Sequence, residues 1–388
     1  MRPNADLAQA LLQSRIETDS LFDLVRPDAL YDRPIPERHR IIFYLGHLEA
    51  FDWNLIGRAL EIPLFHADFD QLFSFGIDPG SNNLPVDQPS DWPGVDEVRE
   101  YNARVRQQLD ASLANAPEQL MHVAIEHRLM HAETFAYMLH NLPFEHKVLP
   151  GFSVAPSGPA PEARMVEIPA GGATLGRKRG SGFGWDNEFG EHSVDVPAFA
   201  IGEHKITNGE YLEFVNEGAA APGFWVCHEG RWCYRGMFAD IPLPQAWPVY
   251  VTYEQALAYA AWKGKALPSE AQFHRAAYEG GPVDLSRENV DFRSWDPVPV
   301  YSSRPNGFGV SQMVGNGWEW TSTPFSPFPG FEPFPFYPGY SANFFDGEHY
   351  VLKGGSPRTA ACLLRSSFRN WFRPGYPYIY ATFRLVEN

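Results

Sequence analysis

Residues 124–134 read Ala124-Ile125-Glu126-His127-Arg128-Leu129-Met130-His131-Ala132-Glu133-Thr134. The segment is typical of an α-helix, in which positions four apart lie on one face because each residue turns the chain by about 100°. We therefore expect His127 and His131 to aim their imidazoles at one metal ion. Glu133 follows two positions later and faces nearly the opposite side, which argues against it as a third ligand. Histidine pairs of this kind also occur at structural and surface positions, so the motif alone is a hypothesis.

A third metal ligand has to come from another part of the chain. His47, in the segment Tyr44-Leu45-Gly46-His47-Leu48-Glu49, is the strongest candidate. Neutral imidazoles suit Fe(II), Zn(II) and Ni(II) alike, so the ligands alone do not identify the metal. Three protein ligands would leave coordination positions open, as catalysis requires.

Composition and charge limit the class of protein. The 388 residues allow two or three domains with a core each, and 44% hydrophobic with 20% charged residues is ordinary for a soluble globular chain. A net charge of −16 argues against nucleic acid or an anionic membrane surface as a partner. No run reaches the ~18 apolar residues of a membrane span. The first residues lack an apolar signal segment, and the three cysteines form no disulfide framework or CxxC site, so we expect a cytoplasmic setting.

The sequence predicts two domains joined by a linker. Residues 1–147 carry apolar positions at helical spacing, with helices expected in the first 20 residues, at 37–60, at 95–113 and from 118 onward. Four such helices predict an antiparallel bundle, a scaffold that builds metal sites from inward-facing side chains. Residues 148–164 are rich in Pro, Gly and Ser and predict an extended linker. The chain also has a long irregular stretch at 75–93. Loops of that length in compact domains more often have a function than not.

Residues 165–388 have a different pattern. Short β-type runs at 165–168 and 192–196 are separated by Gly and Pro turns, and only two helices are expected, at 208–216 and 253–262. The stretch 324–343 is crowded with Pro, Gly, Phe and Tyr, which disfavours regular structure. The domain is therefore predicted to be α+β with much ordered coil.

This second domain resembles the formylglycine-generating-enzyme (C-type-lectin-like) fold. The resemblance is carried, in the family's order, by Ile168-Pro169-Ala170-Gly171, Asp186-Asn187-Glu188, Ile206-Thr207-Asn208-Gly209-Glu210-Tyr211, Gly264-Lys265-Ala266-Leu267-Pro268-Ser269-Glu270-Ala271, Gly315-Asn316-Gly317-Trp318-Glu319-Trp320 and Lys353-Gly354-Gly355-Ser356. Most of these residues serve turns and packing, and one fold can host many functions. The paired copper cysteines of the formylglycine-generating enzyme have no counterpart near the C-terminus, where only Cys362 stands. That activity is therefore not expected.

The first domain resembles the DinB-like four-helix bundle. A DinB-like bundle joined to this second fold is the architecture of the ergothioneine- and ovothiol-type sulfoxide synthases, which also includes selenoneine synthases. The residues His127, His131 and Glu133 match the family's H-x-x-x-H-x-E signature, and His47 matches its upstream ligand. The resemblance implies a non-haem Fe(II) held by His47, His127 and His131, with O2 as co-substrate. It also implies oxidative C–S or C–Se bond formation on the imidazole of hercynine, a trimethylated histidine.

The resemblance implies substrate-binding and catalytic residues as well. Family members contact the histidine-derived substrate through an Arg-Asn-aromatic segment, which carries over to Asn370 and Trp371. Aromatic faces suit a trimethylammonium group. A family segment with two tyrosines three apart, one of them a proton donor, is matched by Tyr337-Pro338-Gly339-Tyr340. Tyr337 is the first candidate for the catalytic acid and Tyr340 the second, although tyrosines in such loops often serve packing.

Two departures from the family pattern concern the substrate that donates sulfur or selenium. Met130 stands where many members bind the imidazole through a glutamine, and Phe372 stands where γ-glutamylcysteine-using members have an acidic residue. Met130 and Thr134 flank the metal-facing edge of the helix and are expected to contact substrate. The departures make γ-glutamylcysteine a less suitable donor than cysteine, and they suit a selenosugar donor. Arg369 and Arg373 are able to bind a substrate carboxylate or equally to hold acidic residues of the protein.

Two further classes of function stay open at this point. A three-histidine site also suits catalytic zinc, as in a DinB-like thiol transferase or hydrolase. Alternatively, the second domain is a binding module without chemistry. In the leading interpretation, the site lies in a cleft between the domains, beside the stretch 75–93.

Overall fold

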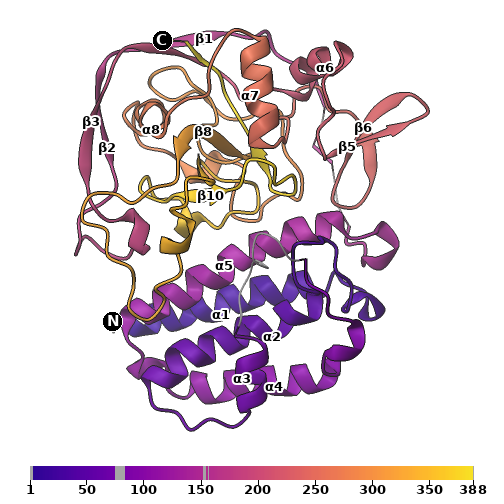
Figure 1. Ribbon diagram of the computed structural model, residues 1–388, viewed down its shortest axis with the longest axis vertical. Coiled ribbons are helices and arrows are strands. Elements are labelled where there is room, and N and C mark those ends of the chain that lie inside the picture. The colour runs from indigo at the N-terminus through magenta and orange to yellow at the C-terminus, as the bar shows by residue number, and fades with distance from the viewer. Residues whose placement is uncertain (1–2, 75–83, 152–153, 156, 388) are drawn as a thin grey trace. The chain divides into compact units, whose positions relative to one another are not determined.

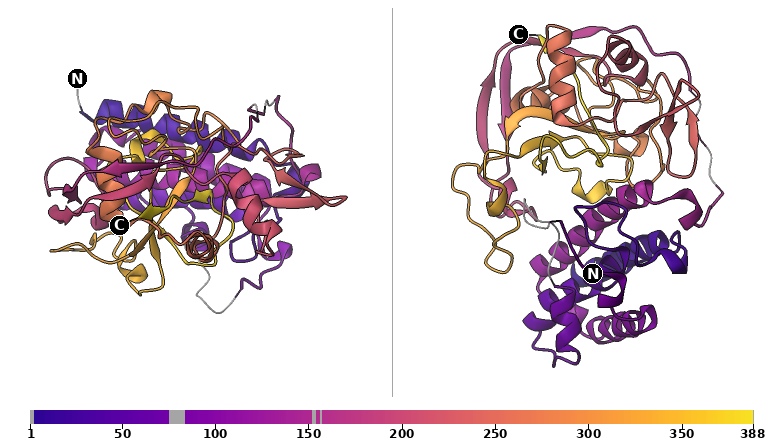
Figure 2. Two further views of the ribbon diagram at one scale, coloured as in Figure 1. Left: turned by 90° about the horizontal axis from the view of Figure 1, so that it is seen from above. Right: turned by 45° about the vertical axis from the view of Figure 1, so that its right-hand side comes forward.

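The structure is a computed structural model that describes residues 3–74, 84–151, 154–155 and 157–387. The chain forms two compact units, Met1–Phe152 and Ser153–Asn388, and each is considered by itself. The first unit is helical, whereas the second mixes short strands, helices and ordered coil (Figure 1, Figure 2). The predicted class, a helical bundle followed by an α+β domain, is therefore confirmed.

The first unit consists of four long helices and one short helix over its described residues. Their bounds are α1 Pro3–Phe22, α2 Ile41–Asp52, α3 Ala67–Leu72, α4 Val95–Asp110 and α5 Glu118–Asn141. Helix α1 packs against α5, and α2 packs against α4. Helix α4 shows why these segments associate, because Val98, Val105 and Leu109 follow one another at spacings of seven and four residues and are all buried.

Two details of this unit differ from the sequence prediction. Helix α2 begins at Ile41 rather than at residue 37, because the backbone of Arg40 is extended (φ −64°, ψ 156°). Beyond Asp52 it continues as a π-helical turn, Trp53–Gly57. The short helix α3 was not expected, and its N-terminus is capped by the ring of His66, which accepts a hydrogen bond from Phe69 N at 3.3 Å. Of the predicted irregular stretch, residues 75–83 lie outside the described residues.

A buried ion cluster joins α5 to α2. Arg128 of α5 lies 3.0 Å from Glu49 and 2.6 Å from Asp52 of α2, and all three side chains are at most 1% exposed. Its guanidinium also donates to the carbonyl of Leu48 at 3.0 Å. Burial raises the pKa of Glu49, but Arg128, Arg106 and Arg15 outweigh that effect and hold the pKa at about 2. The cluster therefore keeps a carboxylate charged inside the bundle.

The second unit contains short strands arranged in small sheets. Its strands are β1 Met165–Ile168, β2 Gly171–Leu175, β3 His192–Val196, β4 Phe199–Gly202, β5 Trp225–His228, β6 Arg231–Arg235, β7 Asp240–Pro242, β8 Trp318–Pro324, β9 Tyr350–Lys353, β10 Asn370–Phe372, β11 Ala381–Thr382 and β12 Val386–Glu387. The sheet orders are β1-β4-β12, β10-β9-β8-β11, β2-β3 and β5-β6-β7. All pairings are antiparallel except that of β11 with β8.

The helices of this unit are α6 Asn208–Asn216, α7 Tyr253–Trp262 and α8 Glu270–Tyr278. The first two coincide with the predicted helices, and β1 and β3 coincide with the predicted strands. The expectation of only two helices is wrong, because α8 is a third. It is nine residues long, and three of its five apolar residues are alanines, so its apolar face is inconspicuous in the sequence. Its capping box was the available signal, since Gln272 N donates to Ser269 Oγ at 3.1 Å and Ser269 N donates to Gln272 Oε1 at 2.9 Å.

Helix α8 closes the hydrophobic core of the second unit. Phe273 packs with Ile168 of β1 and Ile201 of β4, and all three are fully buried. Beyond Pro324 the chain forms no helix or strand until a 3₁₀ turn at Ala342–Phe344, as the composition of 324–343 predicted. Among the described residues, no helix is both long and apolar enough to cross a membrane.

We predict that Arg128→Met lowers the free energy of unfolding of the helical unit by about 3–5 kcal/mol, because it leaves the buried carboxyl of Asp52 without its cation and removes one of the cations that keep Glu49 charged. Chemical denaturation followed by the helical circular dichroism signal measures this change. Arg26→Met is the matched control, since Arg26 is 54% exposed in its pair with Asp28 and should change stability by less than about 0.5 kcal/mol. Equal effects of the two substitutions would contradict a stabilising role of the buried Arg128 cluster.

Candidate metal centre and aromatic site

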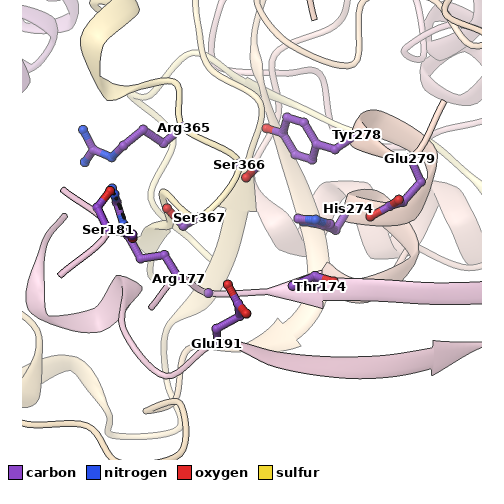
Figure 3. A pocket seen from close by; sticks show the side chains of 11 residues that line it. Thr174, Arg177, Ser181, Glu191, His274, Tyr278, Glu279, Arg365, Ser366 and Ser367 are labelled. Atoms are coloured by element: carbon purple, nitrogen blue, oxygen red, sulfur yellow. Dashed lines mark hydrogen bonds between the residues drawn. The ribbon is translucent and has the colours of Figure 1, made fainter. Parts of the chain in front are cut away.

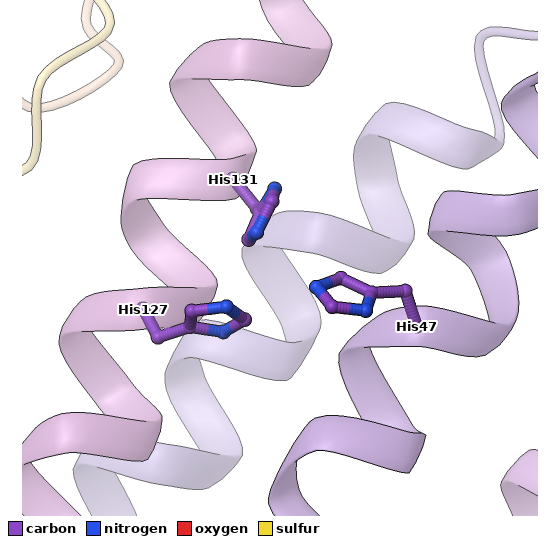
Figure 4. A group of neighbouring side chains, drawn as sticks. All are labelled: His47, His127 and His131. Atoms are coloured by element: carbon purple, nitrogen blue, oxygen red, sulfur yellow. The ribbon is translucent and has the colours of Figure 1, made fainter. Parts of the chain in front are cut away.

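Three histidines of the first unit meet at one point. His127 and His131 lie one turn apart on α5, and His47 faces them from α2 (Figure 4). One ligand nitrogen from each ring lies within 4.8 Å of the other two. The rings are 1%, 2% and 6% exposed for His47, His127 and His131. The structure thus brings together the three residues that the sequence singled out as metal ligands.

The orientation of His47 leaves a ring nitrogen available to a cation. Its Nδ1 lies 2.7 Å from the carbonyl oxygen of Phe73, so Nδ1 carries the proton and donates it. This contact leaves the lone pair on Nε2, a buried atom with no hydrogen-bond partner among the described residues. Nδ1 of His131 is likewise buried and has no hydrogen-bond partner among the described residues. Histidine ligands commonly donate their other ring N–H to a backbone carbonyl, so this geometry fits a metal.

The protonation state of the rings also fits a metal. Burial lowers the pKa of His47 to about 4, although the Phe73 carbonyl favours the protonated ring. Burial likewise lowers the pKa values of His127 and His131 well below the ordinary value. The imidazoles are therefore neutral at pH 7, and metal coordination requires neutral imidazole.

Aromatic side chains stack on two of the three rings and restrict how these can rotate. Phe43 stacks on His47 with ring centroids 4.9 Å apart, and Phe51 stacks on His127 at 3.4 Å. These residues and Phe73 were not predicted as parts of the site, because nothing in their spacing distinguishes them from ordinary core positions. Among the described residues, Glu133 does not join the cluster, as helix geometry predicted.

Met130 and Thr134 lie on the same helix as the histidine pair. Both are half-buried, and the Thr134 hydroxyl donates to the carbonyl of Met130 at 3.2 Å. Their contact with substrate stays a prediction.

The predicted tyrosines of the second unit lie beside the predicted tryptophan. Tyr337 and Tyr340 have ring centroids 5.5 Å apart, and Tyr340 meets Trp371 edge to face at 5.5 Å. Trp371 lies on β10 and stacks on Phe325 at 4.2 Å. Burial raises the pKa of Tyr337 to about 12, helped by the negative charge of Asp186. Tyr337 is therefore a protonated phenol at neutral pH.

The residues on either side of Trp371 in the sequence each contact another residue of the protein. Asn370 is half-buried, and its side-chain oxygen accepts a hydrogen bond from Trp371 N at 2.9 Å. Phe372 stacks on Tyr376 at 5.4 Å. Arg373 is 45% exposed and pairs with Glu348 at 3.4 Å, so its contact with substrate stays a prediction.

Of the two alternatives for Arg369, the structure supports the structural one. Its guanidinium is buried and meets both oxygens of Glu270, at 3.0 and 3.2 Å. It also donates to the carbonyl of Ser326 at 2.9 Å. Arg369 therefore holds an acidic residue of the protein.

A separate polar cavity of about 470 Å³ lies in the second unit, between β2, the start of β3, α8 and residues 365–367 (Figure 3). It contains none of the predicted site residues. His274 faces it and is 4% exposed, and burial lowers its pKa to about 3. Two further lining residues, Arg365 and Ser367, both bind Glu188.

Known proteins resemble both units of the chain. Residues 10–141 match the DinB superfamily, and residues 152–388 match the sulfatase-modifying factor enzyme 1-like domain. The chain is 31% identical to the hercynine oxygenase of Mycolicibacterium thermoresistibile, over 98% of this chain and 94% of that protein. It is 33% identical to the hercynine oxygenase of Mycolicibacterium smegmatis, over 78% of this chain and 79% of that protein.

A fungal relative is longer. The chain is 28% identical to ergothioneine biosynthesis protein 1 of Neurospora crassa over 93% of its own length, but it spans only 55% of that protein. The resemblance stated from the motifs is thus confirmed over both units. This chain belongs to the ergothioneine-type sulfoxide synthase family, in which a DinB-like bundle is joined to a sulfatase-modifying-factor-like domain, together with the hercynine oxygenases and ergothioneine biosynthesis proteins.

Proposed function

We propose that this protein is a non-haem iron enzyme that uses O2 to join sulfur or selenium to the imidazole of hercynine. The observation that carries the proposal is the buried triad of His47, His127 and His131, with neutral rings and ligand nitrogens within 4.8 Å of one another. The relatives named hercynine oxygenase support hercynine and O2 as substrates.

Iron is proposed over zinc because of the reaction. Zn(II) has no redox chemistry, whereas an oxygenase that activates O2 needs a metal that does. Three histidines are also compatible with zinc, so the donor set does not decide between the two metals. Bound Fe(II) would supply redox chemistry and open coordination positions for O2 and the donor.

Residues of the second unit would bind the substrate and supply a proton. The rings of Trp371 and Tyr340 present aromatic faces suited to the trimethylammonium group of hercynine. Asn370 would hydrogen-bond a polar group of the substrate. Tyr337, a phenol that stays protonated at neutral pH, would donate the proton.

The donor is proposed from two side chains. Met130 offers an apolar, polarizable thioether where an amide is common in the family, and Phe372 offers no charge to a γ-glutamyl group. Cysteine or a selenosugar is therefore favoured over γ-glutamylcysteine. In the second case, the protein would be a selenoneine synthase.

An assay with defined donors tests the proposal. Protein loaded with Fe(II) is incubated with hercynine, O2 and either cysteine, γ-glutamylcysteine or a selenosugar, and the products are identified by mass spectrometry. We expect coupling with cysteine or the selenosugar and little with γ-glutamylcysteine. Zinc-loaded protein is the control. Turnover without O2 consumption would favour a zinc thiol transferase, and no coupling with any donor would refute the proposal.

We predict that His131→Ala abolishes stoichiometric Fe(II) binding and hercynine-dependent O2 consumption, because it removes one of three ligands. Metal analysis of the purified protein and an oxygen electrode measure the two effects. His122→Ala is the matched control, since His122 lies on the same helix, is 31% exposed, and is 3.9 Å from Glu118. If the His131 variant still bound iron tightly, the triad would not be the metal site.

Gly46 offers a test of the contact that orients His47. A Cβ at this position would lie 2.6 Å from the ring of Phe73, whose carbonyl accepts the hydrogen bond from His47 Nδ1. We predict that Gly46→Ala displaces Phe73 and weakens Fe(II) binding by about 10–100-fold, the usual cost of losing such an outer contact. Titration of the metal-free protein with Fe(II) measures the affinity. Gly151→Ala, where a Cβ meets nothing within 4 Å, should leave it unchanged.

A further inference from the structure

The 3₁₀ turn Asp186–Glu188 and the preceding Trp185 bury an unusual number of polar groups. Asp186, Asn187 and Glu188 are each at most 1% exposed. Burying carboxylates and an amide is costly unless they are hydrogen-bonded, so their partners reveal what the turn holds in place. The partners belong to two segments of the second unit. One segment carries Tyr337 and Tyr340, and the other leads to Asn370 and Trp371.

One side of the turn holds the loop of the two tyrosines. The Ser341 hydroxyl donates to Asp186 Oδ1 and accepts from Asn187 Nδ2 at 3.0 Å. A backbone hydrogen bond joins Phe334 to the same Asp186 carboxylate. Trp185 stacks on Tyr340, with ring centroids 3.9 Å apart and an angle of 23°. Asp186 therefore binds the loop 334–341 at both of its ends.

The other side of the turn holds the segment that leads to β10. Arg365 donates to both oxygens of Glu188, at 2.6 and 3.1 Å, and Ser367 donates to Glu188 at 2.6 Å. Glu188 also accepts from the backbone of Trp185 at 2.8 Å, which closes the turn. Asn370 and Trp371 follow Ser367 by three and four residues. The turn thus connects the tyrosine loop to the proposed substrate-binding strand.

We propose that the segment Trp185–Glu188 positions Tyr337 relative to Asn370 and Trp371, with Asp186 and Ser341 as the positioning residues. The proposal rests on the function proposed for Tyr337. No helix or strand shapes the described residues 325–341, so side-chain contacts have to set the conformation of this loop. The Asp186 charge has a second effect, because it helps to raise the pKa of Tyr337 and keeps the phenol protonated.

The first test removes the hydroxyl that Asp186 binds. Ser341→Ala is expected to lower kcat for hercynine coupling by about tenfold to 100-fold, as small misplacements of catalytic groups do, and to leave KM for hercynine nearly unchanged. In the metal-free protein, amide hydrogen exchange of residues 334–341 should become faster. The matched control is Ser303→Ala, because Ser303 donates to a half-buried carboxyl, Glu288, at 2.8 Å in the same unit. That variant should change neither kcat nor this exchange.

A second variant separates charge from hydrogen bonding. Asp186→Asn keeps an oxygen that accepts from Ser341 but removes the negative charge. Since that charge raises the pKa of Tyr337, the alkaline limb of the kcat–pH profile should move to lower pH, and exchange of the loop should change little. An unmoved alkaline limb would argue against an effect of Asp186 on Tyr337.

The outcomes distinguish this proposal from the function on which it rests. Full activity of Tyr337→Phe would overturn the proton-donor role of Tyr337, whatever the exchange data show. Unchanged exchange and kcat in Ser341→Ala, with Tyr337→Phe inactive, would overturn the positioning role alone. Equal losses of kcat in Ser341→Ala and Ser303→Ala would also overturn it, because they would reflect general stability.

Discussion

The geometry of the histidine triad depends on the buried guanidinium of Arg128. Arg128 stands next to His127 on α5, and its partners Glu49 and Asp52 lie two and five residues after His47 on α2. A shift of one helix against the other by one turn would leave Arg128 and Asp52 unpaired in the buried interior, which costs several kcal/mol. The same register that pairs the charges also points His47 at His127 and His131. Buried ion pairs are best known for fixing register in this way.

The first unit shows which part of a site can be predicted from local sequence. The pairing of His127 with His131 follows from helical spacing alone. His47 is predicted as the third ligand only as the strongest candidate among the other histidines and by resemblance. No local pattern links it to helix α5, which begins about 70 residues later. The ion cluster was not predicted at all. Arg128 and Asp52 are 76 residues apart, and each looks like an ordinary surface charge in the sequence.

In the second unit, too, local elements were predicted and contacts between distant parts of the sequence were not. Strands β1 and β3 and helices α6 and α7 were predicted because their signals are local, such as alternation, turn residues and caps. The tyrosine loop is held by contacts with no local signal, since Ser341 and Asp186 are 155 residues apart. The motif Asp186-Asn187-Glu188 was visible in the sequence as a mark of the fold. Its bond to the loop became apparent only when the partners of its buried groups were identified.

The two units therefore hold their candidate functional groups by different physical means. In the bundle, helix period and buried charge fix three rings, and aromatic neighbours such as Phe51 limit their rotation. The arrangement leaves Nε2 of His47 buried without a hydrogen-bond partner among the described residues. Such an atom lowers stability unless something binds it, so a cation would recover free energy that the folded chain has lost by burying the ring. In the second unit, most polar groups of the turn are instead hydrogen-bonded, to Ser341 on one side and to Arg365 and Ser367 on the other. Asn187 Oδ1 is buried with no hydrogen-bond partner among the described residues. The histidine triad thus keeps a buried lone pair that a cation would take, whereas the loop 334–341 is held by hydrogen bonds from within the protein.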